Sequence, residues 1–194
     1  MEKNLEERVS ELEKLVKSLL QEKVVEVAKG LKVNDIFQLA GINWKILEIT
    51  DKGYHCHAVD NWKKLQFDPK SNHWEKASLR KNLDELANEI EKEIGIKLVP
   101  FERNMLSLDG QTEYGACEDR VSLLTVDEYR KYRSMLPNTD DYWWWLLTPW
   151  STPCNDYKTS VAVVSPAGRI DYDCCSRNYG VRPFCIFPSV IFES

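Results

Sequence analysis

Two adjacent cysteines, Cys174 and Cys175, are the residues of this 194-residue chain with the clearest chemical potential. A reactive thiolate needs electropositive surroundings, and Arg177 lies close to both in the sequence. Neighbouring cysteines rarely form an unstrained disulfide, because their Cα atoms lie closer together than a disulfide requires. We interpret the pair as tolerated surface thiols, with a redox or nucleophilic role as the alternative.

Two further pairs have the spacing of metal ligands. His55 and His57 occupy alternate positions of a predicted strand, so both imidazoles project from one face. Asp171 and Asp173 also occupy alternate positions of a predicted strand, and two carboxylates on one face are suited to binding Ca²⁺ or to acid–base catalysis. No third ligand is evident for either pair, and solvated histidines are the preferred interpretation of the first. No phosphate loop, GxSxG or CxxC motif is present. We therefore assign no catalytic residue, metal ligand or cofactor, and leave a structural Ca²⁺ open.

Composition restricts the partners. The net charge of −5 and the absence of a Lys/Arg-rich run argue against nucleic acid. Residues 1–29 lack the apolar stretch of a signal peptide, and no segment is apolar for the ~18 residues of a membrane span. We expect synthesis in the cytoplasm, with virion association left open. The six cysteines lack the spacing of small secreted disulfide scaffolds, so we expect free thiols.

Heptad spacing marks residues 1–29. Apolar residues recur in steps of four and three, with Val at a and Leu at d: Leu5, Val9, Leu12, Val16 and Leu19. This predicts a short coiled-coil helix that makes a homo-oligomer of undetermined chain number. The alternative is an amphipathic helix packed on its own domain. Gly30 is expected to end the helix.

Residues 30–194 show an α+β pattern. Asp51, Lys52 and Gly53 separate two runs that predict a hairpin. Ser78 is a candidate cap for one helix, and Thr125 to Glu128 has the form of a capping box for a second. The expected hairpin strands are 42–49 and 54–59, the helices run through Leu79 to Ile90 and from Thr125 to about Met135, and further strands are 160–164, 169–173 and 181–187.

Three consecutive tryptophans precede the last third of the chain. In a strand, Trp144 points away from the face that carries Trp143 and Trp145, so at least one indole should be buried and another should lie near the surface. A buried aromatic cluster is the preferred interpretation. Trp150 follows Pro149 in a predicted loop, where an exposed aromatic side chain can anchor a contact.

The chain contains the segments 44–47 (WKIL), 74–80 (WEKASLR), 142–149 (YWWWLLTP), 161–164 with Gly168, and 179–183 (YGVRP). Together they resemble a family of uncharacterised bacterial and prophage domains whose hallmarks are WWLRSPG, a Gly-containing hairpin and GVRPA. Leu147 and Trp150 stand where that family usually has Arg and Gly, and Phe184 replaces its last Ala. The resemblance covers about Gly30 to Phe187.

That family is similar to C-type-lectin-like domains of the subtype shared by formylglycine-generating enzymes and by variable proteins of diversity-generating retroelements. The resemblance implies a C-type-lectin-like fold with a ligand surface made by loops within 144–187. In variable proteins, copying replaces adenines by any base. Diversified AAC or AAT codons can then encode every residue type except Lys, Glu, Gln, Met and Trp.

Those five types are scarce where variation is expected. They number 49 of 194 residues, so about ten would be expected among the 42 residues from 151 to 192, yet only Lys158 is found there. Residues 151–157 and 171–179 contain none. Strands and loops are poor in Lys, Glu and Met for other reasons, which explains part of the deficit.

We therefore expect a ligand- or receptor-binding variable protein of a diversity-generating retroelement, encoded by a phage or prophage and directed at an unknown protein or glycan. The alternative is a cysteine oxidase like the formylglycine-generating enzymes, which would use Cys174 or Cys175. Arg182, beside Pro183, is expected to be structural and to pair with backbone carbonyls or a carboxylate. The predicted contact residues are Trp150, Ser151, Thr152, Cys154, Asn155, Asp156, Tyr157, Asp171, Tyr172, Asp173, Cys174, Cys175, Ser176, Arg177, Asn178 and Tyr179.

Overall fold

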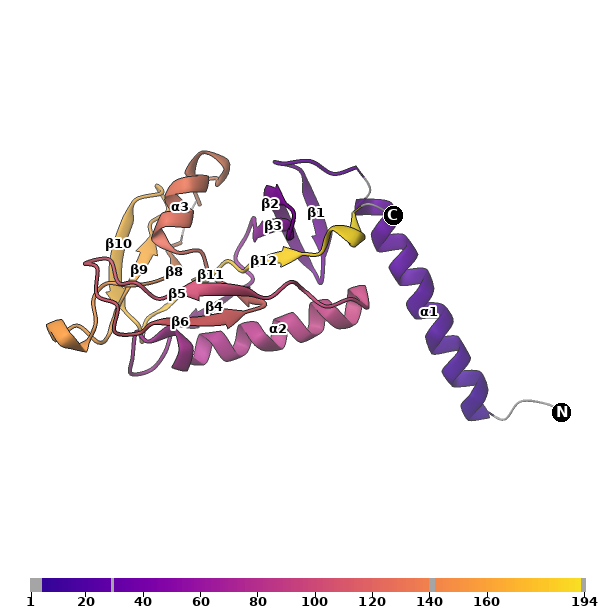
Figure 1. Cartoon of the computed structure of the whole chain (residues 1–194), viewed down its shortest axis with the longest axis horizontal. Coiled ribbons are helices and arrows are strands. Elements are labelled where there is room, and N and C mark those ends of the chain that lie inside the picture. The colour runs from indigo at the N-terminus through magenta and orange to yellow at the C-terminus, as the bar shows by residue number, and fades with distance from the viewer. Residues whose placement is uncertain (1–4, 29, 140–141, 193–194) are drawn as a thin grey trace.

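The computed structural model describes residues 5–28, 30–139 and 142–192. Its N-terminal helix α1 (Leu5–Ala28) projects from a globular part that contains sheets and further helices (Figure 1). The predicted helix and the α+β class are therefore confirmed. Gly30 follows the helix with a positive φ of 77°, which suits a residue that ends a helix. None of the described helices is both long and apolar enough to cross a membrane.

The first sheet is built around the predicted hairpin. Its order is β1-β2-β3-β12-β7, and all neighbouring strands in it are antiparallel. The C-terminal strand β12 thus pairs with a hairpin that lies far earlier in the sequence. The strands are β1 (Ile36–Leu39), β2 (Ile42–Thr50), β3 (Gly53–Ala58), β7 (Val121–Ser122) and β12 (Phe184–Phe187).

The second sheet carries the predicted contact loops. Its order is β10-β9-β8-β11-β4, and β8 and β11 are parallel whereas the other neighbours are antiparallel. A separate two-stranded ribbon pairs β5 with β6. The strands are β4 (Lys63–Gln66), β5 (Phe101–Asn104), β6 (Ala116–Asp119), β8 (Trp144–Pro149), β9 (Ser160–Val164), β10 (Ile170–Cys174) and β11 (Asn178–Val181).

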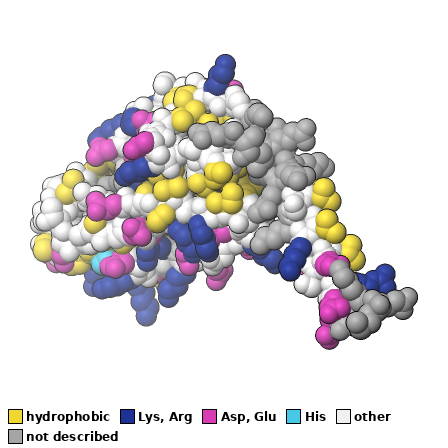
Figure 2. Space-filling model, turned by 45° about the vertical axis from the view of Figure 1, so that its right-hand side comes forward, with side chains coloured by type: hydrophobic (Ala, Val, Ile, Leu, Met, Phe, Trp, Pro, Cys, Tyr) yellow, Lys and Arg dark blue, Asp and Glu magenta, His cyan; other side chains and the backbone are white. Residues whose placement is uncertain are grey.

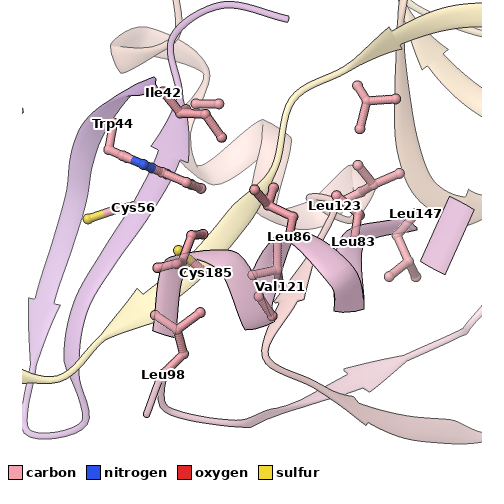
Figure 3. Close-up of a cluster of buried hydrophobic side chains, with 14 of the residues drawn as sticks. Ile42, Trp44, Cys56, Leu83, Leu86, Leu98, Val121, Leu123, Leu147 and Cys185 are labelled. Atoms are coloured by element: carbon pink, nitrogen blue, oxygen red, sulfur yellow. The ribbon is translucent and has the colours of Figure 1, made fainter. Parts of the chain in front are cut away.

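A large apolar core joins the first sheet to helix α2 (Ser78–Ile94). The helix buries the side chains of Leu79, Leu83, Leu86 and Ile90, which are spaced to lie on one face as the sequence predicted. Figure 3 shows side chains from β2, β3, α2 and β12 converging in this core. At ~25 cal/mol per Å² of apolar surface, such burial is the main stabilising contribution.

The tryptophan run links two cores, and the predicted opposite directions of Trp144 and Trp145 are confirmed. Trp145 belongs to the large core, whereas Trp144 points to the opposite face of β8 and packs in a second core with Tyr129 and Phe184. Trp143 is half-buried. Because both faces of β8 are covered, the segment before Trp150 is held rigidly.

The two helix starts differ from each other. Helix α3 (Val126–Tyr132) begins with the predicted capping box, in which the Thr125 side chain accepts from the Glu128 N–H and the Glu128 side chain accepts from the Thr125 N–H. The predicted cap of α2 is wrong. Ser78 is the first helical residue, and its N–H donates to the Asp68 carboxylate at 3.1 Å. A side chain from outside the helix therefore takes the capping role.

Short 3₁₀ turns complete the chain. The turn η2 extends α3 to Met135, close to the predicted end of that helix, and η3 lies in the first predicted contact loop. These turns are η1 (Trp74–Lys76), η2 (Arg133–Met135), η3 (Pro153–Asn155) and η4 (Ser189–Ile191).

The last predicted strand, 181–187, is divided by Arg182 and Pro183. Its two parts belong to different sheets, as β11 and β12. Proline has no N–H for a strand ladder, so a break at this position is physically reasonable. Arg182 is fully buried, and its Nε donates to the Ala58 carbonyl at 3.1 Å while its Nη2 donates to the Val59 carbonyl. The predicted pairing with backbone carbonyls is confirmed.

His57 is fully buried, so the expectation of a solvated side chain is wrong for this residue. Its ring lies 5.5 Å from that of Trp144, and neither ring nitrogen has a hydrogen-bond partner among the described residues. Burial lowers the pKa of His57 well below its ordinary value, and the nearby Arg182 charge adds to the effect. The residue is therefore neutral in the folded protein.

Protein stability should fall on acidification from pH 7 to pH 5. The unfolded chain takes up a proton at His57 near pH 6.5 and the folded chain does not, so the free energy of unfolding should drop by up to ~1.4 kcal/mol per pH unit below that pKa. Urea unfolding at pH 7, 6 and 5 measures this change in the free energy of unfolding. His57→Phe should flatten the slope, leaving the smaller contributions of His55 and His73, whose pKa values burial also lowers. An unchanged slope in the variant would contradict the assignment.

Candidate ligand-binding site

Three aromatic side chains from the predicted contact segments lie on or next to strands of the second sheet. Trp150 directly follows β8, and its N–H donates to the Ser160 carbonyl at 2.9 Å. The Trp150 ring lies 4.2 Å from the Tyr172 ring of β10, with the ring planes inclined by 30°. Tyr172 is 47% exposed and Tyr157 is 50% exposed. The sheet therefore presents partly exposed aromatic rings that can provide apolar contact area.

A cavity of about 320 Å³ opens beside Trp150 and Tyr157. This volume is within the range of small-molecule sites, and its walls combine aromatic and polar groups as such sites do. The lining residues are Leu108, Asp109, Trp150, Ser151, Asn155 and Tyr157.

Asp109 provides a permanent negative charge in this cavity. Its carboxylate accepts hydrogen bonds from Ser107 Oγ at 2.5 Å, Ser151 Oγ at 2.6 Å and Asn155 Nδ2 at 2.8 Å. These hydrogen bonds, that of Ser107 first, lower the pKa of Asp109 to about 2. The cavity therefore presents an ionised carboxylate, which can accept hydrogen bonds from hydroxyl or amino groups.

Asn72 holds the first loop in place. This buried side chain lies below the loop, and its Nδ2 is within hydrogen-bonding distance of the carbonyls of Ser151 (2.8 Å), Tyr157 (3.1 Å) and Ser160 (2.9 Å). Its Oδ1 accepts from Tyr114 OH at 2.6 Å. One amide thus joins both ends of the loop to the body of the domain, which fixes the loop backbone while leaving exposed side chains free to differ.

The second loop is fixed by a tyrosine. Tyr179 OH donates to the Asp173 carboxylate, which also accepts from the Cys174 N–H at 2.6 Å. The Tyr179 ring lies 5.0 Å from the ring of Trp145 in the core. Asp173 and Tyr179 therefore connect the strands at the two ends of this loop, β10 and β11.

The predicted contact residues divide into three groups by exposure. Ser151, Thr152 and Cys175 are buried, so their side chains are not on the exposed contact surface, although Ser151 lines the cavity. The half-buried residues are Trp150, Asp171, Asp173, Cys174, Ser176 and Tyr179, and the exposed residues are Cys154, Asn155, Asp156, Tyr157, Tyr172, Arg177 and Asn178.

The two adjacent cysteines have different environments. The expectation of two surface thiols is wrong for Cys175, which lies in the large core, where burial raises its pKa to about 12. Cys174 is half-buried, and a hydrogen bond with Ser176, 3.2 Å from its Sγ, lowers its pKa. All six cysteines are free. If one of the pair is reactive, the thiolate is Cys174.

The paired histidines and aspartates do not converge with other ligands. The described part of the chain contains no group of three or more His, Cys, Asp or Glu side chains arranged to hold a metal ion. His55 lies 3.1 Å from Thr50 Oγ1, and Asp171 is 3.6 Å from the Arg169 guanidinium.

Sequence reasoning missed the residues that come from outside the loops. Leu108 and Asp109 line the cavity, and Asn72 holds the loop, yet each lies more than 40 positions before Trp150. The only local signal is the Asp109-Gly110 pair, which is typical of a turn. Nothing in it indicates contact with Ser151 or Asn155.

Comparison with known families matches residues 92–189 to a domain of unknown function, DUF6273. The chain belongs to the DUF6273 family. No curated protein and no solved structure matches it. The DUF6273 region contains both contact loops, Asp109 and Arg182, but it is not a complete structural unit. Its strand β12 pairs with β3 and its strand β11 pairs with β4, and both partners precede residue 92.

Proposed function

We propose that this protein is a ligand- or receptor-binding variable protein of a diversity-generating retroelement, carried by a phage or displayed by its host. The loops 151–157 and 171–179 would provide the contacts, on a domain of the C-type-lectin-like class with the subtype of formylglycine-generating enzymes. The observation that carries the proposal is that loop 151–157, composed only of residue types reachable from diversified codons, lines an exposed cavity beside Trp150, whose ring packs on Tyr172 of the second such segment.

The residues that hold the first loop and the residues exposed on the loops lie in different parts of the sequence, and this separation supports the proposal. Asn72 and Asp109, which hold the first loop, precede the predicted variable region, whereas the exposed side chains are within it. Binding surfaces that vary need a rigid scaffold and adaptable side chains such as Tyr, Ser and Asn. The half-exposed Tyr157 and Tyr172 provide large contact area at low entropic cost.

Randomising the exposed loop positions should leave the domain folded. In a library varied at Cys154, Tyr157, Tyr172, Arg177 and Asn178, most members should melt close to the parent, because exposed substitutions usually change stability by less than ~0.5 kcal/mol each. Panning the library against immobilised streptavidin blocked with biotin should yield binders. Thermal melts of random members and sequences of the selected members are the measurements.

The matched control library varies the buried members of the same loops, Ser151, Thr152 and Cys175. Most of its members should fail to fold, because polar or large replacements there disturb the core. A first library that mostly unfolds would contradict the proposal. So would genomic DNA without a near-repeat of the codons for about 144–187, differing at adenines and accompanied by a reverse-transcriptase gene.

A further inference from the structure

An apolar stripe along α1 is left uncovered by the other residues that the structure describes. The predicted seam residues Leu5, Val9, Leu12, Val16 and Leu19 are each between 46% and 75% exposed. Figure 2 shows apolar side chains along this projecting helix. The described contacts of α1 with the globular part are to α2, β1 and η4. The helix therefore does not pack this stripe on its own domain, which was the alternative interpretation of the heptads.

The charges beside the stripe distinguish two ways of pairing such helices. With Leu12 at d and Val9 at a, Glu6 and Glu13 are at e positions and Arg8 is at g, and all three side chains are exposed. Parallel helices face g against the e position of the next heptad, which brings Arg8 to Glu13 of the second copy. Antiparallel helices face e against e, which brings Glu together with Glu.

We propose that α1 pairs with α1 of a second copy in parallel, through the seam from Leu5 to Leu19. Val at a with Leu at d favours two helices. Leu15, at g beside the seam, is 59% exposed and widens the apolar surface that pairing covers. Exposed apolar side chains in a continuous stripe are typical of an interaction surface.

Parallel pairing would place both globular parts at the same end of the helix pair. In Figure 1 the loop that contains η3 lies at the end of the globular part farthest from α1. Both candidate ligand sites would then face away from the helix pair, and two weak contacts could act together through effective concentration. The pairing itself does not depend on what the loops bind.

Sedimentation equilibrium of the full chain tests the seam. The parent should show a concentration-dependent mass that approaches two chains. Leu12→Asp should raise the Kd of the dimer about 100-fold, because both helices lose a buried leucine. Ser10→Asp, with the same added charge at a b position on the opposite face, should change the Kd by less than about threefold. Near-UV circular dichroism should be unchanged in both variants, since Leu12 does not pack on the globular part.

Charge exchange tests the orientation. Arg8→Glu and Glu13→Arg should each weaken the dimer by about fivefold, and the double exchange should restore it. A dimer tightened by Glu13→Arg alone would overturn the parallel orientation, because that change removes the Arg8–Glu13 attraction of parallel helices but turns a Glu6–Glu13 repulsion between antiparallel e positions into an attraction. A monomeric parent, or a Leu12→Asp variant that still dimerises like the parent, would overturn the pairing.

Discussion

Replacing Glu128 by alanine is expected to lower the free energy of unfolding by about 3 to 5 kcal/mol, because it leaves a buried charge without its partner. Arg103 is buried at the junction of β5 and α3. Its Nη1 and Nη2 donate to the two oxygens of Glu128 at 2.7 and 2.6 Å, and Nη2 also donates to the Leu123 carbonyl at 2.7 Å. The same carboxylate completes the capping box with Thr125.

The ionised state of Glu128 agrees with this role. Burial disfavours the charged carboxylate, but the hydrogen bonds and charge of Arg103, together with the Thr125 N–H, outweigh burial and hold the pKa of Glu128 below its ordinary value. Replacement therefore removes both an ion pair and a helix cap, which is why we expect one of the largest effects in the chain.

Asp127→Ala is the matched control for Glu128→Ala. Asp127 is the neighbouring acid in the first turn of α3, but its side chain is 84% exposed and pairs with the exposed Arg130. Its loss should cost no more than ~0.5 kcal/mol. Urea denaturation of both variants is the measurement, and similar midpoints for the two would show that the Arg103 contact contributes little.

Arg182→Ala should cost about 2 to 4 kcal/mol of unfolding free energy. The substitution removes the hydrogen bonds to the carbonyls of Ala58 and Val59 in the interior and the contact of the guanidinium, whose carbon lies 4.9 Å from the Trp144 ring centroid. Burial lowers the pKa of Arg182 to about 10, so the side chain remains charged at neutral pH. It joins the end of β3 to the turn between β11 and β12.

Arg182→Lys should recover little of this loss, since an ammonium group lacks the fork that reaches two carbonyls. Arg177→Ala provides the control, because Arg177 is an exposed member of the second loop and should change stability by less than ~0.5 kcal/mol. Melting temperatures of the three variants separate these outcomes. An Arg182→Ala variant that melts like the parent would refute the structural role.

The DUF6273 match and the structure define different boundaries. The matched region begins near the end of α2, yet its C-terminal strands pair with β3 and β4. Arg182 bonds to carbonyls at positions 58 and 59, and Asn72 holds the first contact loop. The region thus depends on the preceding part of the chain for both its sheets and its candidate site.

The sequence by itself determined the elements whose signals are local. The α1 heptads, the β2–β3 hairpin, the apolar face of α2, the Thr125–Glu128 capping box and the opposite directions of Trp144 and Trp145 were all predicted. Each depends on residues only a few positions apart, because helix and strand periodicity and cap geometry are properties of one segment. The loop after Trp150 was predicted for the same reason, but the second predicted loop, 171–179, is mostly strand, and only residues 175–177 connect β10 to β11.

Only the tertiary structure decided which residues meet across long separations. The residue types of Cys175, Thr152 and His57 suggest exposed or reactive side chains. All three are nevertheless buried, because other segments of the chain cover them. Asp109 and Asn72 contact the first loop from two other parts of the chain. Asp68 caps α2 in place of Ser78. Burial and hydrogen-bond pairing depend on what packs against a residue, and a residue's neighbours in sequence do not carry that information.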